Sequence, residues 1–271
     1  MNRTQLCVRA AAGGLLIVAA SFIPRRADAF EVYTSPRNAD VSSVGATSVR
    51  IEAAAGGLRV EGRSDISQVH IRGTAKANSR SRLDDIKLIA ERRGNVVFIK
   101  ADMPEIHGSL WSLMHGDLQQ ALDLVIEVPN SLPLDVADGS GEAEFTNTGA
   151  IDLEDGSGEV FVRSARGDVR ITDGSGNITI DGVQGSVRVS DGSGNITSKN
   201  VTGNFIVGED GSGDIDVSSV GGTMRVENDG SGNIDVDRVA GDFVVDHDGS
   251  GTIRYATVKG SVDIPSRKRR S

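Results

Sequence analysis

The sequence predicts an all-β protein whose main part is a single-stranded parallel β-solenoid with coils of about 18–19 residues. The first observation is a repeat: the tetrad Asp-Gly-Ser-Gly occurs seven times between Asp138 and Gly251, at spacings of 17, 18, 18, 19, 19 and 19 residues. The second is that apolar residues recur at the same offsets in successive repeats. Units of this length bury their apolar faces by stacking on their neighbours.

Each repeat is expected to form two short strands and two turns. Counted from the aspartate as position 0, apolar residues occupy positions 5 and 7, and again 14 and 16, an alternation typical of strands with one buried face. Glycines at positions 1, 3 and 12 separate these pairs, where we expect turns with positive φ. The coil from Asp191 departs from the pattern with Ser198 at position 7. Stacked about 4.8 Å apart, the strands would be hydrogen-bonded on both sides.

Residues 30–137 lack the tetrad but also contain alternating segments, such as 48–52, 57–62 and 69–73. They predict irregular N-terminal coils that continue the regular solenoid of residues 138–264. Residues 105–123 are an apolar insertion around Trp111 with roughly helical spacing. We interpret it as a lid over an open end or face of the solenoid, and the alternative is an exposed contact loop for a partner or membrane.

Residues 1–29 resemble a bacterial secretory signal peptide. Arg3 and Arg9 are followed by the apolar run 10–23 and by the small-x-small pattern Ala27-Asp28-Ala29. Fourteen apolar residues are too few for a comfortable membrane span, so a cleaved signal is predicted, with no transmembrane span afterwards. An exported location in the periplasm, on the cell surface or in the medium follows. Cys7, the single cysteine, would be lost with the signal.

Charge is distributed unevenly along the chain. The formal net charge is −9, and residues 138–263 carry 23 Asp and Glu against 9 Lys and Arg. A body this acidic would repel phosphate, so nucleic-acid binding is not expected. The tail, residues 265–271, is basic and is interpreted as a solvated terminus; the alternative is contact with an anionic surface. Its basic residues are Arg267, Lys268, Arg269 and Arg270.

The acidic, glycine-rich loops raise the question of calcium. The 18-residue period resembles that of calcium-binding β-rolls, but Ile234 stands at the ligand position and Asp235 comes one place late. The opposite turn carries no acid pattern, although both halves would have to supply ligands. We expect each carboxylate to accept amides of its own Gly-Ser-Gly turn, with only loose cation association along the column. The candidates for that association are Asp138, Asp155, Asp173, Asp191, Asp210, Asp229 and Asp248.

Catalytic and cofactor sites are not predicted. No Lys-Ser/Thr follows the glycines, which excludes a phosphate-binding loop. No histidine or lysine recurs beside the repeated serines, so a nucleophile would lack its base. The four histidines, His70, His107, His115 and His247, match no common metal-binding spacing.

The segment LDLVIEVPNSLPLDVADGSGEAEF, followed by repeated D-G-S-G-[ND]-I units, resembles the bacterial putative-adhesin β-strand-repeat family of unknown function, including adhesin-head domains. The resemblance covers roughly residues 45–264. It implies the solenoid fold and offers no catalytic motif, since the family has no established chemistry.

These observations together favour a non-enzymatic envelope protein that presents a rigid solenoid surface for structural or adhesive contact with an envelope protein or a glycan. The outward polar positions 4, 6, 13 and 15 would form that surface or a merely solvated face. The alternatives are a divalent-cation (calcium)-dependent solenoid and a carbohydrate-active enzyme.

Overall fold

The structure is a computed structural model that describes residues 32–104 and 120–265. The chain divides into two units, Met1–Phe30 and Glu31–Ser271, and every described residue belongs to the second. The expected signal peptide and most of the apolar insertion, including Trp111, lie outside the described residues. The basic residues 267–270 lie outside them as well.

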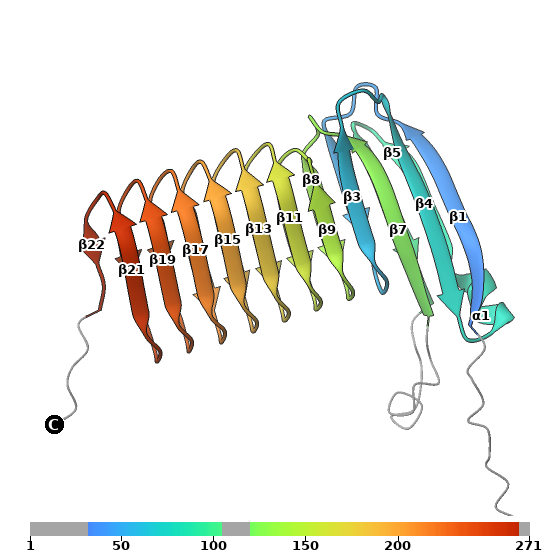
Figure 1. The fold of residues 1–271 in the computed structure, drawn as a ribbon. Helices are drawn as coiled ribbons and strands as arrows, with labels where there is room; N and C mark the ends of the chain where they lie inside the picture. Colours follow the sequence, from blue (N-terminus) through green and yellow to red (C-terminus); the bar gives the residue numbers. More distant parts are fainter. Residues whose placement is uncertain (1–31, 105–119, 266–271) are drawn as a thin grey trace, which may run out of the picture. The chain divides into compact units, whose positions relative to one another are not determined.

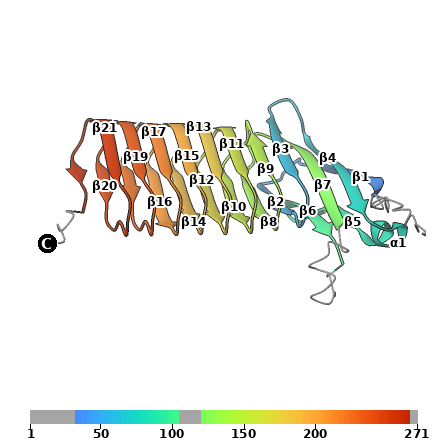
Figure 2. The ribbon, with the colours of Figure 1, turned by 60° about the horizontal axis from the view of Figure 1, so that its bottom comes forward.

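The described residues form two eleven-stranded sheets, and the parallel β-solenoid is confirmed (Figures 1 and 2). Each regular coil contributes one strand to each sheet. Sheet A contains, in spatial order, β1 (Tyr33–Ser42), β4 (Gln68–Ala77), β7 (Gln120–Pro129), β3 (Leu58–Arg63), β9 (Ala143–Thr146), β11 (Val160–Ala165), β13 (Ile178–Val183), β15 (Ile196–Val201), β17 (Ile215–Val220), β19 (Ile234–Val239) and β21 (Ile253–Val258). Sheet B contains β22 (Val262–Asp263), β20 (Phe243–Val245), β18 (Met224–Val226), β16 (Phe205–Asp210), β14 (Val187–Asp191), β12 (Val169–Asp173), β10 (Ile151–Asp155), β8 (Leu134–Asp138), β2 (Ser48–Glu52), β6 (Val96–Asp102) and β5 (Lys87–Arg93).

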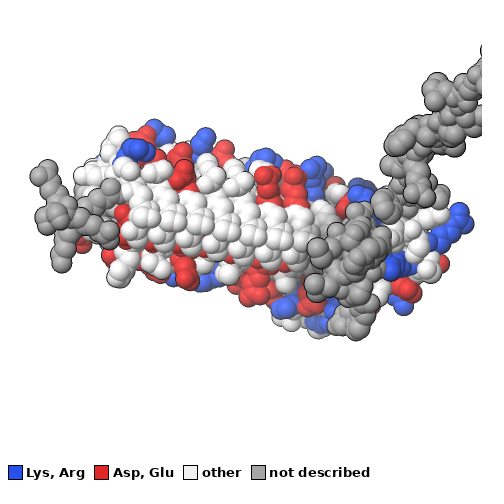
Figure 3. Space-filling model, turned by 90° about the horizontal axis from the view of Figure 1, so that it is seen from below, with Lys and Arg blue, Asp and Glu red and all other residues white. Residues whose placement is uncertain are grey.

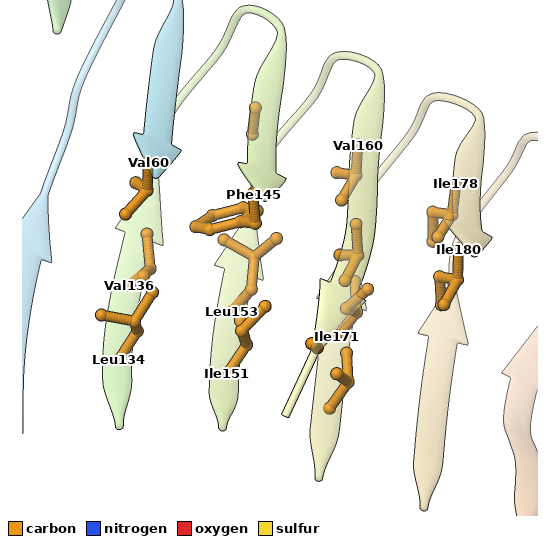
Figure 4. Packing of buried hydrophobic residues seen from close by; sticks show 14 of the residues in the cluster. Val60, Leu134, Val136, Phe145, Ile151, Leu153, Val160, Ile171, Ile178 and Ile180 are labelled. Carbon is orange, nitrogen blue, oxygen red and sulfur yellow. The ribbon is translucent and has the colours of Figure 1, made fainter. Parts of the chain in front are cut away.

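Apolar columns run through the stack between the two sheets. Equivalent repeat positions pair directly, as in Val160 with Ile178 and Ile178 with Ile196. From β9 to β20 the apolar residues at these positions are buried, as the alternation predicts. Figure 4 shows the part of these columns that includes Phe145, Val160 and Ile178. The core is therefore a set of aliphatic ladders, each extended by one side chain per coil.

Pairing changes from parallel to antiparallel toward the N-terminal end of the sheets. β4 pairs antiparallel with both β7 and β1, and β5 pairs antiparallel with β6. The β5–β6 connection is a tight hairpin, and Gly94 in its turn has φ +61°. The short helix α1 (Arg80–Asp85) buries Leu83, and the Arg37 guanidinium donates to the carbonyls of Leu83 and Ile86. Sequence periodicity did not predict this helix. No helix in the described ranges is long and apolar enough to cross a bilayer.

The glycines serve two different purposes, which corrects the expectation of positive φ at all three positions. Only position 3 has positive φ, from +130° at Gly141 to +155° at Gly232. At positions 1 and 12 glycine is required because a Cβ would meet the previous coil: at Gly192 it would lie 2.4 Å from the carbonyl oxygen of Gly174. The second left-handed residue of each coil is at position 9, where non-glycine residues such as Asn200 (φ +60°) are common.

Ser198 is a packing defect in an aliphatic column. It pairs with Ile180 and Val217, is 0 % exposed, and its hydroxyl has no hydrogen-bond partner. A buried hydroxyl without a partner is destabilising, so Ser198→Val should raise the free energy of unfolding by about 1–2 kcal/mol in urea denaturation. Thr197→Val, on the outward side of the same strand, is the control and should change it by less than about 0.5 kcal/mol. Equal effects of the two substitutions would contradict this account.

Candidate functional site

The seven repeat aspartates form a column that faces the interior of the solenoid. The first five are the last residues of their sheet B strands, and each pairs in register with the next, as Asp155 does with Asp173. Isolated bridges extend the column from Asp210 to Asp229 and Asp248. Relative exposure is 6 % at Asp138 and falls to 1 % at Asp210 and Asp229, while Asp248 in the last coil is half-buried.

The inward direction was missed in the sequence, although a signal was present. In the 18-residue coils the aspartate follows position 16 by two residues, so it is in phase with positions 14 and 16 on the buried face. The aspartate was assigned to the turn that it begins and was not counted with the strand positions. Figure 3 shows the edge on which the sheet A strands begin, and an uncharged band runs along it.

The 19-residue coils keep this register by means of a bulge. Between β14 and β16 the pairing shifts by one residue after Val189, so that Ser190 pairs with Glu209. Gly208 is the bulged residue and pairs with no residue of β14. Asp210 consequently still pairs with Asp191. The extra residue lies on the strand, and the aspartate column continues without interruption.

Each carboxylate is only partly satisfied. The prediction that it accepts amides of its own turn is confirmed at three positions: Gly139 N donates to Asp138 at 2.8 Å, Ser175 N to Asp173 at 3.1 Å and Ser193 N to Asp191 at 3.0 Å. At least one carboxylate oxygen is buried without a hydrogen-bond partner among the described residues at Asp138, Asp155, Asp173, Asp191, Asp210 and Asp229.

Burial raises the pKa values of the column, and neighbouring carboxylates raise most of them further. The pKa rises to about 7 at Asp138 and Asp210 and to about 6 at Asp155, Asp191 and Asp229; that of Asp173 also rises. The turn amides act in the opposite direction because they favour the anion.

Full ionisation of the column would be costly. With about 1.4 kcal/mol per pKa unit, and an allowance for solvent at the corner, ionising a carboxyl whose pKa has risen to about 6–7 costs roughly 2–4 kcal/mol. The five groups with such pKa values would together cost as much as the whole stability of a typical domain, about 5–15 kcal/mol. Within the described ranges no three or more His, Cys, Asp or Glu side chains are arranged to hold a metal ion. Loose cation association along the column stays a prediction.

Two further polar ladders follow the corners of the coils and are structural. At position 4, Asn195 N donates to Asn177 Oδ1 at 3.0 Å and Asp214 N to Asn195 Oδ1 at 2.9 Å. At position 13 the Asp168 carboxylate accepts from Ser186 N in the same way. Because these side chains accept hydrogen bonds from the next coil, the candidate contact surface narrows from positions 4, 6, 13 and 15 to positions 6 and 15.

The outer face of sheet B is hollowed into a groove of about 510 Å³ that spans the starts of β8 to β16. Its accessible apolar surface comes from Pro133, Ala150 and Ile206, and charged residues lie along it. Arg170 is exposed in its middle and has no ion-pair partner among the described residues. Arg188 instead forms a two-bond ion pair with Glu227, two coils away, at 2.7 and 3.0 Å. The lining residues are Pro133, Leu134, Ala150, Ile151, Asp152, Asp168, Val169, Arg170, Ser186, Val187, Arg188 and Ile206.

The histidines within the described part of the chain form no catalytic group with the column. His70 Nδ1 is 2.6 Å from Asp40 Oδ1 at the N-terminal end of sheet A. His247 is exposed beside Asp248. His107 and His115 lie outside the described residues.

The comparisons give structural neighbours only. No family model matches the sequence, and no curated protein matches it. Similar solved structures include a putative adhesin from Bacteroides fragilis, 12 % identical over 87 % of this chain and 97 % of that chain with a TM-score of 0.39. A putative cell adhesion protein from Clostridium sporogenes is 11 % identical over 86 % and 99 % with a TM-score of 0.34. A putative lipid binding protein from Parabacteroides distasonis is 13 % identical over 85 % and 94 % with a TM-score of 0.43.

Two of these three structures are described as adhesion proteins. Their identities and TM-scores are too low for any functional argument, so the proposal below is based on this chain's own geometry.

Proposed function

We propose that the protein is a non-enzymatic exported protein of the bacterial envelope that binds an extended partner, an envelope glycan or protein, on the outer face of sheet B. Residues 1–29 would direct its export and residues 32–265 would form the binding body. The observation that carries the proposal is the groove, which crosses five strands, is partly apolar at Ile206, and contains the exposed Arg170, which has no ion-pair partner in the described structure.

Several features support a binding role for this surface. Its strands are hydrogen-bonded on both sides by neighbouring coils, so the groove is preformed and little conformational entropy is lost on binding. Elsewhere on the same face Arg50 pairs with Asp135 and Arg225 with Asp246. Arg170 therefore stands out as the guanidinium available to an anionic or hydroxyl-rich partner.

A glycan array and isolated envelope fractions, each probed with the labelled protein, test the proposal. We expect saturable binding that is weakened at least about tenfold by Arg170→Glu and by Ile206→Glu, since each places an unpaired charge in the groove. The control is Lys199→Glu on the outer face of sheet A, which should bind like the wild type. Equal loss in the control, or no saturable binding to either preparation, would refute the groove.

Export is tested separately by cell fractionation. The full-length protein should be recovered outside the cytoplasm in a form shortened by residues 1–29. Recovery of the uncleaved chain in the cytoplasm would contradict the proposed location without bearing on the groove.

A further inference from the structure

The aspartate column combines three properties that are seldom found together. Six carboxyls at intervals of one coil are almost fully buried, with exposures between 1 % and 6 %. Each of the six has at least one carboxylate oxygen with no hydrogen-bond partner among the described residues. Their strands are hydrogen-bonded in register, so the carboxyls cannot move apart without breaking the ladder.

Among the described residues, the surroundings of the column supply no positive charge. Each aspartate pairs with those of the neighbouring coils, and the sheet A strands that follow the corners begin with buried aliphatic residues such as Ile178 and Ile196. In the adjoining corner, the negative charge of Asp214 raises the pKa values of Asp210 and Asp229 further. No lysine, arginine or histidine contributes to the pKa of any of the six.

Protons from solvent can reach the column. A hollow of about 400 Å³ at the end of the sheet B strands is lined by Thr172, Ser190 and Glu209 together with Asp173 and Asp191. Glu209 adds a further acid, and again no base. The buried carboxyls are thus separated from water by the corner alone.

We propose that the aspartate column is a proton-operated lock on the coil stack, in which carboxyls that keep their protons hold the Asp-Gly-Ser-Gly corners closed and carboxyls that lose them loosen those corners. The closed form lets protonated carboxyls donate hydrogen bonds along the column. The open form relieves the repulsion between buried anions by admitting water. The lock adds a pH response to the protein and does not depend on which partner the groove binds.

The sign of the response follows from proton linkage. The pKa values of the column are raised in the folded state from about 3.8 to about 6–7. The folded state therefore binds more protons than the unfolded chain between about pH 4 and pH 7. The contribution to stability is complete below about pH 4 and is lost as the pH rises through the folded pKa values.

Thermal unfolding of the wild-type protein from pH 4.5 to pH 8, in moderate salt to screen surface ion pairs, is the first test. We expect the Tm to fall by at least about 5 °C across this range. The variant Asp173→Asn/Asp191→Asn/Asp210→Asn keeps an acceptor oxygen at each position and removes the titration of three of the six buried carboxyls, so its Tm should fall only about half as much. The matched control Asp152→Asn/Glu154→Gln/Asp216→Asn removes three exposed acids and should retain the wild-type slope.

A flat or rising wild-type Tm, or a column variant with the full wild-type slope, would overturn the lock. Should the triple variant fail to fold, carboxyl-carbon NMR titration of the wild type decides the matter. The lock requires a set of aspartates that titrate near pH 6–7, and a protein in which all aspartates titrate near pH 4 refutes it.

The last test repeats the thermal unfolding at pH 8, once with a chelator and once with calcium or magnesium. Stoichiometric, saturable rescue by the cation would show a metal-binding column instead and would also overturn the proposal.

Discussion

Replacing Gly194 with alanine should prevent the chain from forming a stable coil stack. Gly194 is at position 3 of its repeat with φ +140°, a conformation that residues with a Cβ rarely adopt. The added Cβ would lie 1.7 Å from the carbonyl oxygen of Gly176 in the previous coil. That oxygen belongs to the backbone of a hydrogen-bonded ladder and cannot move alone, so the loss in free energy of unfolding should exceed about 4 kcal/mol. Urea denaturation followed by circular dichroism measures it.

Gly182→Ala separates the clash from the backbone conformation. Gly182 also has positive φ, +79°, but its nearest neighbour would be Ser164 Cα at 3.6 Å, an ordinary contact. We expect a loss of only about 1–2 kcal/mol, the usual cost of a left-handed residue with a side chain. If both alanine variants were destabilised equally, the close approach of successive coils would not be what requires glycine at position 3.

Phe205→Ala should be among the most damaging of the simple truncations in the regular coils. Phe205 is 0 % exposed and stacks between Val187 and Met224 in a column of sheet B. Its removal leaves a cavity that cannot close, because the strands on either side are held at a constant spacing by their hydrogen bonds. The expected loss is about 3–5 kcal/mol in urea denaturation.

The neighbouring Ile206 is the control for this truncation. It lies on the outward side of the same strand and is partly exposed in the groove. Ile206→Ala should cost less than about 1 kcal/mol, since solvent fills the space. A similar loss at both positions would mean that the coil interior tolerates a large cavity.

The regular coils were predictable from the sequence because their evidence is local and repeated. A tetrad at constant spacing and alternating aliphatic residues specify the strand, its buried face and its neighbour in the stack at once. The N-terminal strands were predicted as strands, but not the antiparallel pairing of β4 and β5. That pairing depends on where the chain reverses, and alternation is the same in parallel and antiparallel strands.

The candidate site divides in the same way. The seven aspartates could be identified from the sequence as a column, and their amide bonds at Asp138, Asp173 and Asp191 were expected. Their burial was not, because a glycine-rich tetrad resembles an exposed turn and the last strand residue is hidden within it. Arg170 and Arg188 occupy the same position of the repeat. Arg188 is paired because Glu227, two coils away, reaches it, whereas Arg170 has no ion-pair partner among the described residues.

The sequence by itself determined the solenoid, its coil length and the column that the aspartates form, since each is expressed by spacing along the chain. Only the tertiary structure decided that positions 4 and 13 bind the next coil and that glycine is required at positions 1 and 12 by the coil beneath. The physical reason is that these properties depend on distances between residues 17 to 19 apart, which exist only once the coils are stacked.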